Sequence, residues 1–401
     1  MFKRSVFKII ILCLLVSSCS SIPESKQNEE ISEEVTMFSM IPEQLFSNYI
    51  KANYDAKGYA KFSRFYPQQF EVYSDNKMYR EMSDSAAGVV LNFITTGNTI
   101  QFKCKIENKL KTFSPVLEQI SMSAVVFALK NIPKNNTEKK RLLLDGIDLV
   151  VDGKLISTKH IRNGSIKFNF NNPLKNKCEV KIYFPVIFEM RIKDLKINGI
   201  VEKVESKENI LCLGDSITQG FIAGSPSQNY VALLSAELNV NALNQGVGGY
   251  VYESRSLNGL EQYKEQFGLP KFITVGYGTN DWNYMIPEYI LEKNIADYYK
   301  HLVEIFPATP IYVITPIWRG DSELKPSEPL SERLLKGKMP FEHIAKMIRE
   351  ETKVYPTITI IDGMKLLPHD FRLFSDVYLH PNAEAFAIMA HNIIEQAKLK
   401  N

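Results

Sequence analysis

The spacing of apolar residues changes near residue 205, and this change constrains the fold more than any other feature of the sequence. From about residue 206, short apolar runs alternate with stretches that have helical spacing. The apolar runs are 210–213, 240–243, 272–275, 311–314 and 358–361. The helical stretches include 287–305, 340–352 and 382–398. Strands that alternate with helices form right-handed βαβ units. We therefore expect a three-layer α/β domain with a five-stranded parallel sheet over residues 206–401.

The chain before this point has the period of two that is typical of strands. Apolar and polar residues alternate over 100–106, 166–170 and 180–186, which places one row of side chains on a core. Asp152-Gly153 lies between two apolar runs and is typical of a hairpin turn, since glycine readily adopts positive φ. Many short strands separated by turns favour a β-sandwich, jelly-roll-like, over residues 41–205.

The first 40 residues predict a leader followed by a tether. Basic residues precede a short apolar run at 9–16, which is too short to span a bilayer, so residues 1–19 are interpreted as a signal peptide. Small residues just before Cys19 resemble the bacterial lipobox, which implies cleavage there and acylation of the thiol. Residues 20–40 are polar and acidic, as in a flexible tether. We expect an exported, membrane-anchored lipoprotein in the periplasm or at the cell surface; an ordinary secretory signal is the alternative.

Charge and cysteine content narrow the range of functions. The 401 residues include 48 basic and 45 acidic ones, too balanced for the concentrated basic face that binds nucleic acid. Cys104, Cys178 and Cys212 follow the leader without the spacing of metal ligands, so neither a metal nor another cofactor is implied. A Cys104–Cys178 disulfide is possible in an exported protein, but three buried thiols are the preferred interpretation.

Four short motifs lie after the predicted parallel strands or just before the last helix, where α/β folds place their ligands. They are Gly214-Asp215-Ser216, Asn244-Gln245-Gly246-Val247-Gly248-Gly249, Gly278-Thr279-Asn280-Asp281 and Asp376-Val377-Tyr378-Leu379-His380-Pro381-Asn382. Backbone N–H groups and an asparagine amide can hold an oxyanion, and a histidine oriented by a carboxylate can deprotonate a serine. Each motif alone also fits a turn or a helix cap. Together, and in this order, they indicate nucleophilic catalysis.

These GDSIT, NxGxGG, GTND and HPN segments resemble the four sequence blocks of the SGNH (GDSL-like) hydrolases. That family hydrolyses esters and thioesters without a metal, on a flavodoxin-like three-layer fold. The resemblance implies that Ser216 is the nucleophile and one oxyanion donor, and that His380 is the general base. It also implies Gly249 as the second oxyanion donor, with Gly248 as the alternative if the register shifts by one, and Asn280 as the third.

The acid partner of His380 departs from the family's pattern. An aspartate usually lies three residues before the histidine, but Val377 occupies that position here and the aspartate is one residue earlier, at Asp376. A one-residue bulge would restore the geometry, so the resemblance implies Asp376. Asp370 or a backbone carbonyl is the alternative, and His369 is the other histidine nearby.

A weaker likeness links Gly146-Ile147-Asp148-Leu149 and the turn after it to the β-domain of some bacterial two-domain carbohydrate acetylesterases. It implies a serine esterase for short-chain acyl esters, O-acetyl groups in particular, with carbohydrates as candidate substrates. Trp282 and Trp318 are candidates to face sugar rings, with lid or core residues as the alternative. The alternatives are a lysophospholipase or thioesterase for longer acyl chains, and a catalytically dead carbohydrate-binding lipoprotein.

Overall fold

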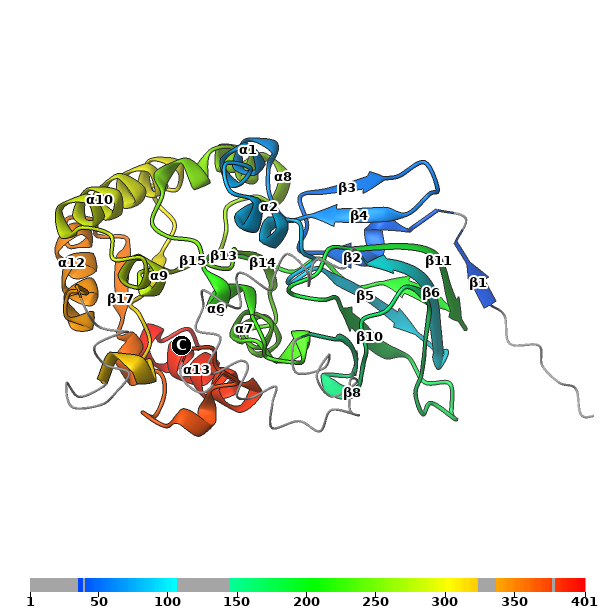
Figure 1. Ribbon diagram of the computed structural model, residues 1–401. Coiled ribbons are helices and arrows are strands. Elements are labelled where there is room, and N and C mark those ends of the chain that lie inside the picture. Colours follow the sequence, from blue (N-terminus) through cyan, green and yellow to red (C-terminus); the bar gives the residue numbers. More distant parts are fainter. Residues whose placement is uncertain (1–34, 39, 107–144, 324–336, 377–378, 401) are drawn as a thin grey trace, which may run out of the picture. The chain divides into compact units, whose positions relative to one another are not determined.

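The computed structural model describes residues 35–38, 40–106, 145–323, 337–376 and 379–400 (Figure 1). The predicted signal peptide, Cys19 and most of the predicted tether lie outside these ranges. In the part of the chain that is described, no helix has both the length and the apolar character needed to cross a membrane. Three residues that the prediction assigns to the tether, Val35–Met37, instead form strand β1.

The N-terminal region forms two antiparallel sheets, as predicted. One sheet has the order β3 (Lys51–Tyr54), β4 (Ala60–Ser63), β11 (Met190–Asn198), β6 (Thr99–Ile106) and β9 (Gly164–Asn169), and β1 pairs with β11. The other has the order β12 (Val201–Lys203), β5 (Val90–Thr95), β10 (Cys178–Tyr183), β7 (Ile147–Val151) and β8 (Lys154–Lys159), and β2 (Phe46–Ser47) pairs with β5. The predicted alternation is confirmed in β6, where Ile100 and Phe102 are buried and face the core. Asp152 and Gly153 both have positive φ and form the turn between β7 and β8.

Two short helices interrupt this region between β4 and β5, where the sequence predicts mainly strands. Pro67 begins α1 (Pro67–Tyr73), a position where its missing N–H is no loss. Asn76 caps α2 (Lys77–Ser83) by accepting the backbone N–H of Met78. Both helices are too short for a clear apolar period, so local propensity did not reveal them.

The C-terminal region contains the predicted five-stranded parallel sheet. Its strand order is β14 (Asn241–Gly246), β13 (Asn209–Gly214), β15 (Ile273–Gly276), β16 (Ile311–Ile314) and β17 (Ile358–Ile361). The helices of this region are α6 (Ser216–Gln219), α7 (Tyr230–Glu237), α8 (Tyr263–Phe267), α9 (Thr279–Asn283), α10 (Glu288–Ile305), α12 (Phe341–Thr352) and α13 (Ala383–Ala397).

Short 3₁₀ turns occur in both regions. The N-terminal region has η1 (Glu43–Leu45), and the C-terminal region has η2 (Pro226–Gln228), η3 (Ser254–Leu257), η4 (Leu260–Gln262), η5 (Gly320–Glu323), η6 (Gly363–Lys365) and η7 (Phe371–Leu373).

Successive residues of β13 face two different cores, which explains the continuous apolar run in the sequence. Leu211 and Leu213 belong to a core that includes residues of α10 and α12. Ile210 and Cys212 belong to a second core that includes residues of α7 and α13. These helix pairs therefore cover opposite faces of the parallel sheet, as Figure 1 shows, and complete the three layers.

The N-terminal region is joined to β14 by buried polar contacts. The side-chain amides of Gln69 and Gln245 donate to one another, with N–O distances of 3.0 and 3.2 Å. The Gln245 amide also donates to the Arg64 carbonyl at 2.8 Å, and the Gln69 amide to the Ser256 carbonyl at 2.8 Å. One apolar core extends from the sandwich to residues of the parallel sheet. The two regions therefore share an interior.

The three cysteines of the described residues are buried thiols. Cys104, Cys178 and Cys212 are all free, which confirms the interpretation as small apolar side chains over a Cys104–Cys178 disulfide. Burial raises the pKa of Cys212 to about 12, so this thiol stays protonated.

Candidate active site

Ser216 begins helix α6, and only Asp215 separates it from the end of strand β13. Asp215 caps this four-residue helix, since its carboxylate accepts the Ile217 N–H at 2.9 Å. A side chain at Gly214 would meet Thr218 Oγ1 at 2.1 Å, so the sharp turn from strand to helix needs glycine there. As the first helical residue, Ser216 has no acceptor for its N–H within the helix, which leaves this donor available beside its own hydroxyl.

Ser216, His380 and Asp376 form a buried chain of hydrogen bonds. Ser216 Oγ lies 2.9 Å from His380 Nε2, and His380 Nδ1 lies 2.6 Å from Asp376 Oδ2. None of the three side chains is more than 3% exposed. With the ring proton on Nδ1, toward the carboxylate, the lone pair of Nε2 faces the serine hydroxyl. This arrangement can remove the Ser216 proton.

The loop around Asp376 compensates for its unusual position in the sequence. Asp376 Oδ1 accepts the backbone N–H groups of Leu379 and His380, each at 2.9 Å, and this directs Oδ2 toward the imidazole. Burial alone would raise the pKa of this carboxyl, but the charge of His380 and the hydrogen bonds outweigh burial and hold the pKa below its usual value. Asp376 therefore carries the charge that orients His380.

The alternative groups near His380 are engaged elsewhere. Asp370 caps η7 and pairs with Arg372, whose hydrogen bonds lower the pKa of that carboxyl to about 2. The His369 ring stacks on Trp318 with 5.1 Å between centroids, and its Nδ1 lies 3.1 Å from Glu323. The structure thus brings Asp376, and not Asp370, into contact with His380.

The loop after β14 contains both glycine candidates for the oxyanion hole. Val247 donates its N–H to the Gly214 carbonyl at 2.9 Å, so the loop starts beside the turn that carries Ser216. Gly248 donates its N–H to Gln219 Oε1 at 2.7 Å. The Gly249 N–H, at a residue with φ of +78°, has no acceptor among the described residues. The arrangement therefore favours Gly249 over Gly248 as a donor.

Asn280 lies in α9, which follows strand β15. Its Nδ2 donates one proton to the Tyr250 carbonyl at 3.0 Å, which leaves the second proton for a ligand. The neighbouring Asp281 is fully buried, and burial raises its pKa to about 7. Its Oδ1 accepts the Tyr252 N–H at 3.1 Å, and its Oδ2 has no partner among the described groups.

The two tryptophans proposed to face sugar rings are buried core residues. Trp282 and Trp318 are each 2% exposed. Trp282 donates to the Met339 carbonyl at 2.7 Å and packs edge-on against Phe341. Neither indole offers a face to a ligand, so of the two interpretations the structure supports core residues and not faces for sugar rings.

The comparisons with known proteins concern the family of the α/β region and the fold of the chain. Residues 212–388 match the sequence profile of the GDSL-like lipase/acylhydrolase family. This part of the chain is therefore similar to that family, and an additional N-terminal region precedes it. The chain has no match among curated proteins.

Three solved structures share the fold over nearly the whole chain. They are a salicylyl-acyltransferase, SsfX3, from a tetracycline biosynthetic pathway (TM-score 0.64, 14% identity, 91% of this chain and 97% of that one); a putative GDSL-like lipase from Bacteroides ovatus (0.62, 20%, 91% and 98%); and a family two carbohydrate esterase from Cellvibrio japonicus (0.56, 15%, 91% and 98%). At these identities the likeness shows the fold, including the sandwich placed before the parallel sheet.

Proposed function

We propose that this protein is a serine esterase that removes short acyl groups, O-acetyl groups in particular, from carbohydrates. The observation that carries the proposal is the buried chain from Ser216 through His380 to Asp376. It lies in a region that matches the sequence profile of a family of lipases and acylhydrolases.

The geometry supports acyl transfer to water in two steps. Ser216 Oγ attacks the ester carbonyl while His380 takes its proton, and His380 then protonates the leaving alkoxide. Water, deprotonated by His380, attacks the acyl-enzyme and releases the carboxylic acid and free Ser216. The N–H groups of Ser216 and Gly249 and the amide of Asn280 would hold each tetrahedral oxyanion. Removing one such donor should cost about 3–4 kcal/mol in the transition state.

A short acyl group and a carbohydrate alcohol are supported by two separate observations. A side chain added at Gly249 would meet Met78 Cε at 2.6 Å and Tyr284 Oη at 3.1 Å, so these two side chains border the proposed oxyanion hole and limit the room beside it. The Cellvibrio protein, named a family two carbohydrate esterase, covers both the sandwich and the α/β region. The first favours acetyl over long chains, and the second supports a sugar ester.

The test is hydrolysis of p-nitrophenyl acetate by the protein without residues 1–19, beside its Ser216→Ala variant. We expect turnover that disappears in the variant, and acetate release from acetylated xylan by the unmodified protein only. A series from acetate to octanoate separates the alternatives. Rates that rise with chain length would favour a lysophospholipase or thioesterase. No turnover of any ester would favour a catalytically dead carbohydrate-binding protein.

We also propose that the mature protein is an exported lipoprotein acylated at Cys19. The support is the sequence of residues 1–19, with its basic start, short apolar run and small residues before the cysteine. Metabolic labelling with an alkyne fatty acid should label the protein in the membrane fraction. Cys19→Ser should remove the label; a variant that stays labelled would contradict the assignment.

A further inference from the structure

Arg64 is a buried arginine of the N-terminal region, one residue beyond β4, and its side chain is 0% exposed. Its guanidinium makes five hydrogen bonds. Nε donates to the Ser85 carbonyl, Nη2 to the Met82 carbonyl and to Ser85 Oγ, and Nη1 to the carbonyls of Asn244 and Gly246. Burial lowers the pKa of Arg64 to about 9, so it remains charged at neutral pH. A buried charge is costly, and here backbone and hydroxyl oxygens compensate for the lost hydration.

The two carbonyls that Nη1 binds lie at the end of strand β14. Arg64 Nη1 lies 2.6 Å from the Asn244 carbonyl oxygen and 3.1 Å from the Gly246 carbonyl oxygen. The loop with Gly248 and Gly249 starts at the next residue. The guanidinium therefore fixes the direction in which the backbone leaves the strand for the proposed oxyanion hole.

A second contact holds the same loop two residues further on. Gln219 Oε1 accepts the Gly248 N–H at 2.7 Å. Gln219 Nε2 donates to Ser85 Oγ at 3.1 Å and to the Val186 carbonyl at 2.5 Å, so this amide rests on the N-terminal region. Ser85 Oγ also accepts Arg64 Nη2 at 2.9 Å. Arg64, Ser85 and Gln219 thus form one network that ends at the N–H of Gly248, the residue before Gly249.

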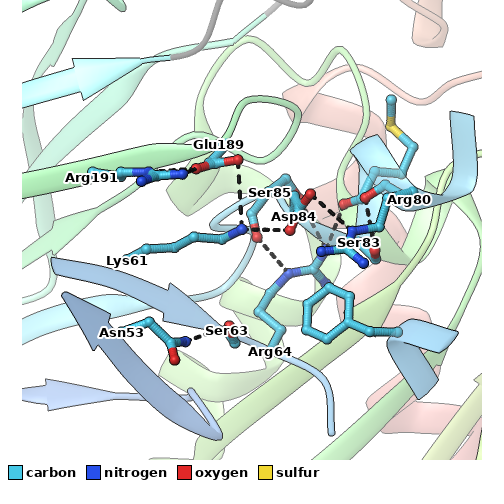
Figure 2. Close-up of polar contacts among 12 residues, drawn as sticks. Asn53, Lys61, Ser63, Arg64, Arg80, Ser83, Asp84, Ser85, Glu189 and Arg191 are labelled. Atoms are coloured by element: carbon cyan, nitrogen blue, oxygen red, sulfur yellow. Dashed lines mark hydrogen bonds and ion pairs between the residues drawn. The ribbon is translucent and has the colours of Figure 1, made fainter. Parts of the chain in front are cut away.

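The segment that carries Ser85 is itself anchored to the sandwich. Asp84 pairs with Lys61 of β4 at 2.5 Å and with Arg80 of α2 at 3.2 Å. Figure 2 shows these ion pairs beside Arg64 and Ser85. These ion pairs hold Asp84, and with it Ser85, in place against the sandwich. The two glycines of the loop after β14 have no side chains and cannot make such contacts themselves.

We propose that Arg64 is a positioning residue of the oxyanion hole, and that through it the N-terminal region sets the direction of the Gly249 N–H. An oxyanion donor acts only if it points at the place where charge develops in the transition state. The inference rests on the proposed function, because it assumes an oxyanion at Ser216. Loss of Arg64 should weaken binding of the tetrahedral state more than binding of the ester.

The experiment compares Arg64→Met and Arg64→Lys with the unmodified protein, at a temperature where circular dichroism shows all of them folded. We expect kcat/KM for p-nitrophenyl acetate to fall at least tenfold in Arg64→Met and less in Arg64→Lys, which keeps the charge. The Ki of a boronic acid, which forms a tetrahedral adduct on Ser216, should rise by the same factor. Arg349→Met is the control for loss of an arginine outside this network, since Arg349 pairs with Asp362, and it should leave kcat/KM and Ki unchanged.

Each outcome decides a different claim. A folded Arg64→Met with unchanged kcat/KM, or with lower kcat/KM and unchanged Ki, would overturn the inference while leaving the proposed function intact. Absence of Ser216-dependent turnover in the unmodified protein would overturn both. If Arg64→Met does not fold, Ser85→Ala replaces it, because this change removes only the acceptor that Arg64 and Gln219 share. Unchanged kcat/KM in Ser85→Ala would then refute the network.

Discussion

His380 contacts Ser216 through one ring nitrogen and Asp376 through the other, so each nitrogen has its own role. Asp376 Oδ1 is occupied by two backbone N–H groups, and only Oδ2 faces the ring. The carboxylate thereby fixes both the orientation of the imidazole and the position of its proton. Because the pKa of Asp376 lies below its usual value, this holds throughout the neutral range.

Asp376→Asn should lower kcat/KM by a factor of about 10³–10⁴. The amide oxygen must stay with the Leu379 and His380 N–H groups, so the amide NH₂ would face Nδ1. The imidazole would then carry its proton on Nε2 and could not accept one from Ser216. Ester hydrolysis by the variant measures this, with Asp370→Asn as the control for an aspartate that pairs with Arg372. A rate near that of the unmodified protein would exclude Asp376 as the partner.

Asp281→Asn should change how stability depends on pH. The carboxyl ionises near pH 4 when exposed, but burial raises its pKa to about 7 in the folded protein. The folded state therefore holds this proton more strongly, and the stability it contributes below about pH 4 is lost as pH rises to about 7. The neutral variant does not suffer this loss. Its stability relative to the unmodified protein should rise between these pH values, by on the order of 1–4 kcal/mol. Urea unfolding of both proteins at several pH values measures this difference in the free energy of unfolding. A difference that stays constant with pH would show that the Asp281 carboxyl is not responsible.

Among the elements, strands with an apolar run and long helices with an apolar period could be predicted from the sequence, and the short helices α1 and α2 could not. The central strands β13, β15 and β16 are largely buried on both faces, so each contains an apolar run, and α10, α12 and α13 have clear helical periods. Helices α1 and α2 have seven residues each and depend on tertiary contacts, so nothing local distinguishes them. In the candidate site, Ser216, Asn280 and His380 stand in recognisable motifs. Arg64 lies 180 residues before its acceptor in β14 and had no local signal.

The start of α13 depends on one side chain. Asn382 Oδ1 accepts the Ala385 N–H at 3.0 Å, and Asn382 Nδ2 donates to the Arg372 carbonyl at 3.0 Å. Asn382→Ala should lower the free energy of unfolding by about 1 kcal/mol, because the cap is lost. Asn382→Asp keeps the acceptor and adds a favourable charge at the helix start, so most of the stability should return. Chemical denaturation measures both; equal losses would show that the cap is not the cause.

At the scale of the whole molecule, the C-terminal region should not be stable alone. Removing residues 1–205 would expose apolar residues of the shared core, such as Leu243 and Val247. It would also leave the buried Gln245 amide without partners, and each lost pairing costs about 1–3 kcal/mol. Residues 206–401 should therefore show little cooperative unfolding and less than about a hundredth of the esterase rate, compared with residues 34–401. Thermal unfolding and ester hydrolysis test this, and a folded, active fragment would contradict the shared interior.

The reciprocal amide pair of Gln69 and Gln245 has a consequence for how such proteins can diverge. Each amide presents both its oxygen and its nitrogen to the other, so a change on one side leaves a mismatched group on the other. Recombination that brings in a sandwich from a distant relative would separate partners that had adapted to each other. Within a lineage, the two regions should be inherited as one unit, and substitutions at these two positions should occur together.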